Sequence, residues 1–319
     1  MTAQRRTETA VRVHRAGPLA LLQDRGRFGV RHLGVTQGGP ADLYSWAWAN
    51  YLAGNPWGTA SLEITFGGLQ LVAERDLDIA IAGADLGATL DGQPLPLWQR
   101  VIWKEGQKLA FASPVSGLRA YLSVRGGFAA EPVMGSVACV SREQLGGFDG
   151  WGSKLAEGDR LAIHTPDGKP TEGMTKAPDH ARKYFREAPV LELLPGAQIG
   201  EFTGRSLYDA FNTWWSVDDR ADRMGVRLLG PKLHCRIGSL ISEGINLGGV
   251  QVPPDGQPIA LLNDRQTIGG YPRLGALSPL SASRLAQCLP GQEIRLVARS
   301  SGSVLRDYRD FLELFGPAG

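Results

Sequence analysis

The chain has 319 residues, of which 43% are hydrophobic and 21% charged, a composition typical of a globular protein. Its 34 lysines and arginines and its 32 aspartates and glutamates leave a net charge of +2. This near balance gives no electrostatic reason to expect nucleic acid or an anionic membrane as a partner. The length is comfortable for two domains, and 42 glycines indicate a β-rich chain with many turns.

Cysteine and histidine give no sign of a metal site. Cys139, Cys235 and Cys288 lie far apart without a C-x-x-C pair, which also argues against a disulfide framework. The five histidines have no metal-ligand spacing, so we expect no metal on this chain. No apolar segment follows the N-terminal arginines, and the longest uncharged stretch contains glycine, asparagine and proline. We therefore expect a cytoplasmic protein.

The first half of the chain is predicted to form mostly strands and one helix. Residues 11–36 alternate short apolar pieces with glycines, which is typical of strands and turns. A helix is predicted within GGPADLYSWAWANYLAGNP, because apolar residues recur at helical spacing. Pro40 and Asp42 suit its first turn, and Gly54 and Pro56 end it. The pattern then returns to strands at residues 77–83, 95–103 and 152–164.

A linker separates this region from a second β-rich half. Residues 164–184 carry almost no aliphatic side chains and hold three prolines among mixed charges. The second half opens with PVLELLPG, closes with GQEIRLVARS and contains one predicted helix at about residues 204–215. The sequence thus predicts a mainly β chain with two domains of barrel or sandwich type. The predicted boundaries are residues 1–165 for the first domain, 166–186 for the linker and 187–319 for the second domain.

Common catalytic and nucleotide-binding motifs, such as GxGxxG, GxSxG and HExxH, do not occur. Four clusters of polar residues remain as candidate functional sites. In the first, QDRGRFGVRHLGV, Asp24 either bonds its own backbone in a charged turn or faces a cleft with Arg27. In the second, LEITFGG, Glu63 interrupts an apolar strand. Because an unpaired buried carboxylate is costly, Glu63 either points to water or is paired in a site.

The third and fourth clusters lie in the second half. DDRADRMGVRL is either a solvated charge run or a tight bend that presents Arg223. The fourth begins at Gln251 and continues to LLNDRQTIGGYP, where a hairpin with a turn at Asn263 and Asp264 is the plain structural interpretation. A hairpin alone does not explain why Gln266 precedes two glycines that would let a ligand approach the backbone.

Taken together, these segments resemble the KipA-type family of 5-oxoprolinase C subunits, which shares the carboxyltransferase domain of urea carboxylase. The resemblance covers nearly the whole chain, in LQDRGRFGVRHLGV, ANYLAGNPWGTASLEITFGG, GLRAYLSVRGG, DRMGVRL and VQVPPDGQPIALLNDRQTIGGYP. It implies a mainly β fold of two tandem cyclophilin-like β-barrel domains with a few short helices.

The resemblance also implies an activity and partners. The chain would be a subunit of an ATP-dependent 5-oxoprolinase, an amidohydrolase that opens 5-oxoproline (pyroglutamate) to glutamate, and would be inactive alone. Its partners would be a KipI-like B subunit and a LamB/YcsF-like A subunit, with ATP and Mg²⁺ acting at the level of the complex. Because a lactam carbonyl is a poor electrophile, ATP can activate it by phosphorylation, and the developing charge then needs fixed donors.

For that chemistry we expect Asp264 and Gln266 to be the catalytic residues, with Asp264 as the acid/base or orienting carboxylate. We expect the polar stretch 263–271 to line the floor of a crevice between the two barrels. The expected substrate-binding residues are Arg223, Gln251, Thr267, Gly269, Gly270, Tyr271, Asp24, Arg27 and Glu63.

Two departures from the family pattern bear on the choice between 5-oxoproline and a urea-like amide. Residues 135–139 read GSVAC where hydroxyl residues are usual, and Asn246 and Leu247 stand where a proline commonly precedes the glycine. Two other functions stay open. Biotin-dependent carboxyl transfer would need biotin on another polypeptide, since no Ala-Met-Lys-Met motif occurs here. A regulator that binds a histidine-kinase inhibitor would need no chemistry.

Overall fold

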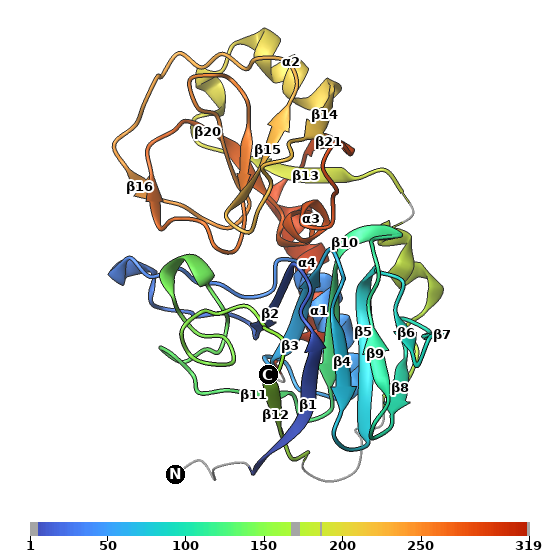
Figure 1. Ribbon diagram of the computed structural model, residues 1–319. Coiled ribbons are helices and arrows are strands. Elements are labelled where there is room, and N and C mark those ends of the chain that lie inside the picture. Colours follow the sequence, from blue (N-terminus) through green and yellow to red (C-terminus); the bar gives the residue numbers. More distant parts are fainter. Residues whose placement is uncertain (1–5, 167–172, 186, 318–319) are drawn as a thin grey trace.

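A computed structural model describes residues 6–166, 173–185 and 187–317 and shows a mainly β chain (Figure 1). We call residues 6–166 the N-terminal half and residues 187–317 the C-terminal half. In Figure 1 most of the C-terminal half lies above the N-terminal half, and its last helix extends down beside the N-terminal half. Part of the predicted linker, residues 167–172 and 186, lies outside the described residues. The prediction of a mainly β fold is confirmed.

The N-terminal half arranges its strands in two sheets. The strands of the first sheet are β1 (Thr7–Arg15), β4 (Gln70–Ala73), β6 (Thr89–Leu90), β7 (Gln93–Pro94), β9 (Lys108–Ala110), β11 (Phe128–Ala129) and β12 (Arg160–His164). Those of the second are β2 (Leu19–Gln23), β3 (Ser61–Thr65), β5 (Leu77–Asp85), β8 (Arg100–Trp103) and β10 (Ser116–Val124). The strand orders are β11-β12-β1-β4-β9-β6-β7 and β2-β3-β10-β5-β8.

Strand β5 is buried on both faces, and its residues alternate in size. Ile79 and Ile81 belong to the core between the two sheets. Ala80 and Ala82 point the other way, into the core around helix α1 (Leu43–Ala53). Because alanine is small, this face lets the helix approach the sheet closely.

Helix α1 begins one turn later than the sequence suggested. Asp42 is its N-cap and accepts a hydrogen bond from the Ser45 N–H at 3.0 Å, so Pro40 lies before the helix instead of in its first turn. Gly54 ends the helix with a φ of 77°, as expected. The helix is buried on most sides because it packs between the second sheet and two helices from the other half.

The C-terminal half forms a closed barrel in the order β13-β20-β17-β18-β15-β14-β21. These strands are β13 (Val190–Pro195), β14 (Trp214–Val217), β15 (Gly225–Leu229), β17 (Gly249–Gln251), β18 (Ile259–Leu261), β20 (Arg273–Leu277) and β21 (Glu293–Ala298). A separate pair consists of β16 (Glu243–Gly244) and β19 (Ile268–Gly269). Across both halves, the described residues also include the short 3-10 segments η1 (Arg31–Leu33), η2 (Ser141–Glu143), η3 (Asp179–Phe185) and η4 (Ile199–Glu201).

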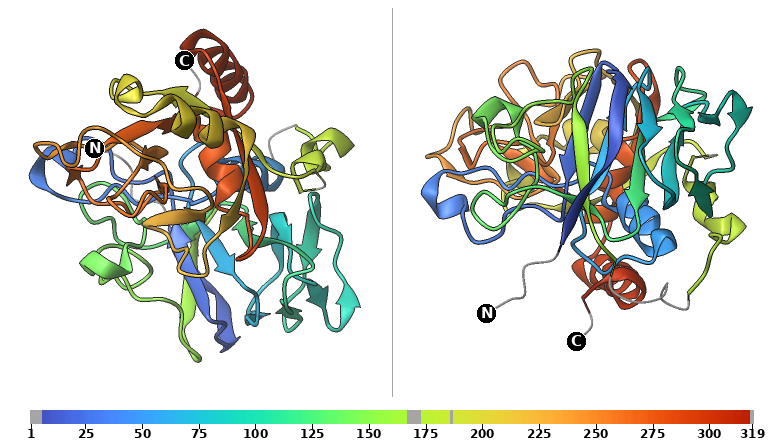
Figure 2. Two further views of the ribbon diagram at one scale, coloured as in Figure 1. Left: turned by 90° about the horizontal axis from the view of Figure 1, so that it is seen from above. Right: turned by 60° about the horizontal axis from the view of Figure 1, so that its bottom comes forward.

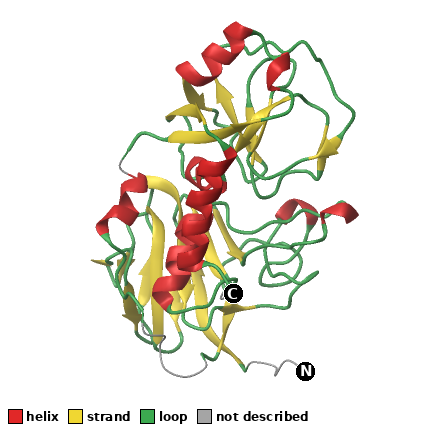
Figure 3. Cartoon of the chain, turned by 180° about the vertical axis from the view of Figure 1, so that it is seen from behind, coloured by secondary structure: helices red, strands yellow, loops and turns green. Residues whose placement is uncertain are grey.

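The helices of the C-terminal half differ from the prediction. The helix expected at about residues 204–215 is α2 (Gly204–Asn212), and it ends earlier because Trp215 enters β14 and fills the barrel core. Two further helices were not predicted, α3 (Pro279–Leu285) and α4 (Ser301–Phe315). Helix α4 leaves the barrel and packs beside α1 of the N-terminal half (Figures 2 and 3). Within the described residues, no helix combines the length and apolar character needed to cross a bilayer.

Candidate active site at the interface between the halves

An arginine of the C-terminal half links carboxylates from both halves. Arg223 donates to both oxygens of Asp264, from Nε at 2.9 Å and from Nη2 at 3.0 Å. Its Nη1 donates to Glu63 of the N-terminal half, and its Nη2 also donates to the Gly39 carbonyl at 2.7 Å. Glu63 is fully buried, and Arg223 and Asp264 are each 6% exposed. Three residues predicted from separate segments therefore meet in one buried ion cluster.

Glu63, on strand β3, accepts more hydrogen bonds than the arginine supplies. Its Oε2 accepts from the Tyr121 hydroxyl at 2.7 Å and from the Ala41 N–H at 2.8 Å, and the Arg119 Nε lies 3.7 Å from its Oε1. Burial by itself would raise the pKa of Glu63, but Arg223 and Arg119, together with the hydrogen bonds from Ala41 and Tyr121, hold that pKa below its usual value. Of the two alternatives for Glu63, the paired one is therefore right.

Asp264 follows strand β18 in a turn at the expected position. The expected hairpin does not form, because β18 pairs with β15 and β17 whereas β19 pairs with β16. Burial raises the pKa of its carboxyl, and the Arg223 guanidinium offsets part of that shift. Because both oxygens accept hydrogen bonds from Arg223, the carboxylate is held in one orientation. Its role as acid/base or orienting group stays a prediction, and this geometry favours the orienting role.

A second buried acid continues the network toward helix α3. The Asp42 N–H donates to the Tyr121 hydroxyl at 2.7 Å, and the Asp42 Oδ2 accepts from the Gln287 Nε2 at 2.7 Å. The Gln287 Oε1 in turn accepts the backbone N–H groups of Leu118 and Arg119, both at 2.9 Å. Burial raises the pKa of Asp42 to about 6, although hydrogen bonds to the carboxylate oppose the shift. One glutamine of the C-terminal half thus joins a helix cap and a strand of the other half.

A cavity of about 640 Å³ lies at the same interface. Thr267 is part of its wall, Gln266 is half-buried next to it, and Tyr271 is 44% exposed farther along the chain. A cavity between the halves therefore exists, but of the stretch 263–271 only Thr267 and Ile268 line it. The predicted catalytic residues Asp264 and Gln266 are not among its lining residues. The lining residues are Arg31, His32 and Gly34 from the N-terminal half and Gly244, Ile245, Asn246, Thr267 and Ile268 from the C-terminal half.

Neighbouring protein atoms fill the space beside the two glycines of the stretch. A Cβ at Gly269 would meet the Ile245 Cδ1 at 2.6 Å and the Gln251 Nε2 at 2.9 Å, and one at Gly270 would meet the Leu240 carbonyl oxygen at 2.6 Å. Both positions therefore need glycine because a side chain would clash. Only their backbone atoms could contact a ligand. Gln251 is 3% exposed, and its Nε2 has no hydrogen-bond partner among the described residues.

Asp24 and Arg27 bond a loop of the N-terminal half instead of the ion cluster. Asp24 accepts the Gly26 N–H at 2.8 Å and the Val137 N–H at 2.9 Å, as the interpretation as a turn predicts. It also lines a separate cavity of about 290 Å³ in the N-terminal half, and Arg27 does not. Arg27 donates from Nε to the Val133 carbonyl at 3.0 Å. In the GSVAC segment held by these bonds, Cys139 is fully buried and burial raises the pKa of its thiol.

Several residues of the interface network were not predicted. Arg119 and Tyr121 come from GLRAYL and Arg31 from RHLGV, segments that carried the family resemblance without receiving a role. Asp42 was assigned only to the helix start, and Gln287 had no sequence signal. Within the described residues, no group of three or more histidine, cysteine, aspartate or glutamate side chains is arranged to hold a metal ion.

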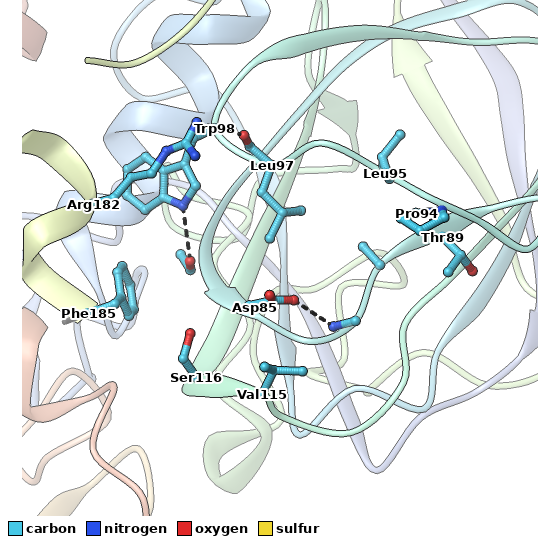
Figure 4. Close-up of a pocket in the computed structure, with 13 residues that line it drawn as sticks. Asp85, Thr89, Pro94, Leu95, Leu97, Trp98, Val115, Ser116, Arg182 and Phe185 are labelled. Atoms are coloured by element: carbon cyan, nitrogen blue, oxygen red, sulfur yellow. Dashed lines mark hydrogen bonds between the residues drawn. The ribbon is translucent and has the colours of Figure 1, made fainter. Parts of the chain in front are cut away.

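A further cavity, of about 560 Å³, lies in the N-terminal half near η3 (Figure 4). Figure 4 labels Arg182 and Trp98 among the cavity's lining residues, and the Trp98 indole N–H donates to the Gly83 carbonyl at 3.3 Å. Asp85 accepts the Gly87 N–H at 2.9 Å. All the predicted site residues are described, and none of them lines this cavity, which favours the interface as the candidate site.

Comparisons with known proteins settle the family. The family model described as "Carboxyltransferase domain, subdomain A and B" matches residues 33–298. The chain is 37% identical over 302 residues to the 5-oxoprolinase C subunit of Escherichia coli (strain K12), which covers 94% of each protein. The chain belongs to the family of 5-oxoprolinase C subunits.

Another member of this family and a solved structure agree with the assignment. The 5-oxoprolinase C subunit of Haemophilus influenzae is 33% identical over 288 residues, which is 88% of each protein. The crystal structure of K. lactis urea amidolyase matches 99% of this chain with a TM-score of 0.88 and 25% identity. The match covers 20% of that urea amidolyase chain, so this chain spans about a fifth of its length.

Proposed function

We propose that the chain is the C subunit of a multi-subunit ATP-dependent 5-oxoprolinase. This enzyme would hydrolyse 5-oxoproline to glutamate, and the chain would act together with KipI-like B and LamB/YcsF-like A subunits. The observation that carries the proposal is the match of 94% of this chain to 94% of a 5-oxoprolinase C subunit. A match over nearly the full length of both proteins supports the same role in the same assembly.

The interface cavity is the proposed place of lactam binding. It joins residues of both halves, and its wall includes the predicted Thr267 next to Gln266. In this proposal Gln266 and Thr267 offer hydrogen bonds to the lactam as charge develops on its carbonyl oxygen. Asp264 lies in the turn that precedes Gln266 and Thr267 in the chain. Its buried ion pair with Arg223 holds this turn, and therefore these two residues, in place.

ATP and Mg²⁺ belong to this proposal at the level of the complex. The two buried carboxylates of the ion cluster do not fit a magnesium ion. Arg223 occupies both oxygens of Asp264, and Glu63 is engaged by Arg223, Tyr121 and Ala41. ATP, when bound in the complex, supplies activation of the lactam carbonyl. This chain's own residues bind and orient the lactam.

Reconstitution with the A and B homologues tests the proposal, with ATP-dependent release of glutamate from 5-oxoproline as the measurement. The complete complex should release glutamate, and the chain alone should not. Gln266→Ala should lower turnover by at least about 100-fold, the usual order for losing one preorganised donor. It should leave binding of the B subunit intact.

Gln93→Ala is the matched control, because Gln93 is an exposed glutamine of β7 in the N-terminal half. It should leave turnover unchanged. Glutamate release that survives Gln266→Ala would contradict the assigned residue, and a complete complex without release would contradict the proposed activity. Stable binding of the partners without any turnover would favour the regulator instead.

Biotin-dependent carboxyl transfer is the second candidate, favoured by the TM-score of 0.88 to a urea amidolyase. Biotin would then arrive on another polypeptide and enter the interface cavity. The same reconstitution separates the two, because a carboxyltransferase would carboxylate urea or a similar amide when given a carboxybiotin carrier, without releasing glutamate.

A further inference from the structure

Two arginines, one from each half, meet at the interface cavity, where Arg31 is part of the wall and Arg265 is not. Arg31, in η1, donates from Nη2 to the carbonyls of Ile245 at 2.6 Å and Thr267 at 3.2 Å. Arg265, which is 3% exposed, donates from Nε to the same Ile245 carbonyl at 3.3 Å. The two guanidinium groups thus share the carbonyl oxygen of Ile245, a residue that lines the cavity.

Neither guanidinium of this pair has a directly bonded carboxylate among the residues that the structure describes. The Arg31 Nη1 is buried without a hydrogen-bond partner among them. Burial, together with the neighbouring Arg31, lowers the pKa of Arg265 to about 9.

The acids nearest to the pair have other partners. Glu143, whose charge acts on Arg31, accepts the Thr36 N–H at 3.0 Å and a hydrogen bond from Arg142 at 3.1 Å. Asp264, whose charge acts on Arg265, has both oxygens bound in the ion cluster. Arg31 therefore presents its positive charge at the cavity wall, and the buried Arg265 adds a second positive charge behind it.

The cavity wall suits an anion. None of its lining residues is acidic, and His32, Asn246 and Thr267 add polar side chains around Arg31. Behind the wall, the Gln251 Nε2 is a buried donor without a described partner, next to Gly269. Burying two like charges side by side is costly, and an oxyanion close to them would offset that cost.

We propose that the cavity binds the oxyanion group of a small acid, a carboxylate or a phosphate, opposite Arg31 and Arg265. Asn246 and Thr267 contribute hydrogen bonds at its rim. Resting on the proposed function, the group is the carboxylate of 5-oxoproline, and its lactam ring lies against the wall formed by Thr267 and Ile268. Recognition of the carboxylate then selects an acidic lactam over a neutral amide.

Calorimetric titration of the isolated full chain tests this assignment with three probes. The probes are 5-oxoproline, the neutral lactam 2-pyrrolidone and inorganic phosphate. We expect 5-oxoproline to bind and 2-pyrrolidone to bind at least about tenfold more weakly, because it lacks the charged group. Phosphate binding with no response to 5-oxoproline would support the oxyanion site and overturn the carboxylate as its source.

Two variants locate the binding. Arg31→Met should weaken anion binding by about 10- to 100-fold, the range for losing a charged hydrogen bond. Since Arg31→Met also removes contacts between the halves, Asn246→Asp serves as the second variant. It keeps the size of an exposed wall residue, adds a negative charge and should weaken binding by at least about tenfold. Arg309→Met, at an exposed position of α4, is the control and should not change binding.

Two results would overturn the proposal. One is that none of the anions binds to the chain, and the other is that binding is unchanged in a folded Asn246→Asp variant. The proposed function fails separately, because the complete complex could lack glutamate release while the isolated chain still binds anions at this cavity.

Discussion

At the interface, removing one guanidinium would leave two buried carboxylates facing each other. Arg223 donates hydrogen bonds to Asp264 of its own half and to Glu63 of the other half, and each of the three residues is at most 6% exposed. Such a cluster is favourable only while it is complete, because each charge loses its hydration on folding. We therefore see Arg223 as a residue that positions the polar stretch following Asp264.

Replacing Arg223 with methionine should lower the free energy of unfolding by about 3–5 kcal/mol, the cost of leaving buried charges unpaired. Urea denaturation would measure it. Arg227→Met is the matched control, because Arg227 pairs with Asp255, whose side chain is 50% exposed. That change should cost no more than about 1 kcal/mol. Equal losses for the two variants would show that the cluster does not stabilise the interface.

Helix α4 is an element of the C-terminal half that completes the core of the N-terminal half. Its Phe311 and Phe315 belong to the same core as Trp48 of α1, and the rings of Phe315 and Trp48 meet edge to face at 4.9 Å between centroids. Val304, Phe311 and Phe315 recur at helical spacing and form its buried side. The helix therefore ties the end of the chain to the face of the second sheet that α1 covers.

Phe311→Ala should lower the free energy of unfolding by about 3–5 kcal/mol, since it empties a buried aromatic site. Leu314→Ala changes a neighbouring residue that is 43% exposed and should cost less than about 1 kcal/mol. Thermal and urea unfolding of both variants would measure the difference. If the two variants lose the same stability, α4 does not pack on α1 in solution.

Across the whole molecule, Asp42 and Gln287 connect the two halves through a titratable bond. The Asp42 Oδ2 accepts from the Gln287 Nε2 at 2.7 Å inside the interface. Burial raises the pKa of Asp42 from an ordinary 3.8 to about 6, so the folded protein holds this proton more tightly than the unfolded chain. The stability that Asp42 contributes is fully present below about pH 4 and is lost as the pH rises through about 6.

Asp42→Asn should remove this pH dependence, because an amide does not titrate and its oxygen can still cap helix α1. Unfolding free energies of wild type and variant, measured between about pH 4 and pH 7, would test it. The wild type should lose up to about 3 kcal/mol relative to the variant over that range. Parallel curves for the two proteins would contradict the assignment.

The sequence predicted more of the fold than of the contacts between the halves. Strands and turns follow from short apolar segments between glycines, and the end of α1 follows from Gly54, since these signals are local. The start of α1 is predicted one turn too early, because Pro40 also suits a first helical turn whereas Asp42 is the N-cap. The same local reasoning wrongly extended α2 to Trp215. A buried tryptophan gives the same local sequence signal whether it lies in a helix or in a barrel strand. Local reasoning also missed α4, whose apolar side needs a surface in the other half.

For the site, the sequence alone selected Glu63, Arg223 and Asp264 as unusual charged residues beside apolar strands. Only the tertiary structure decided that they bond one another, that Asp24 and Arg27 hold a separate loop, and that Arg31 reaches across to Arg265. The reason is physical. The sequence shows which charged residues would cost free energy if they were buried without a partner, but their partners lie in distant segments that only folding brings together.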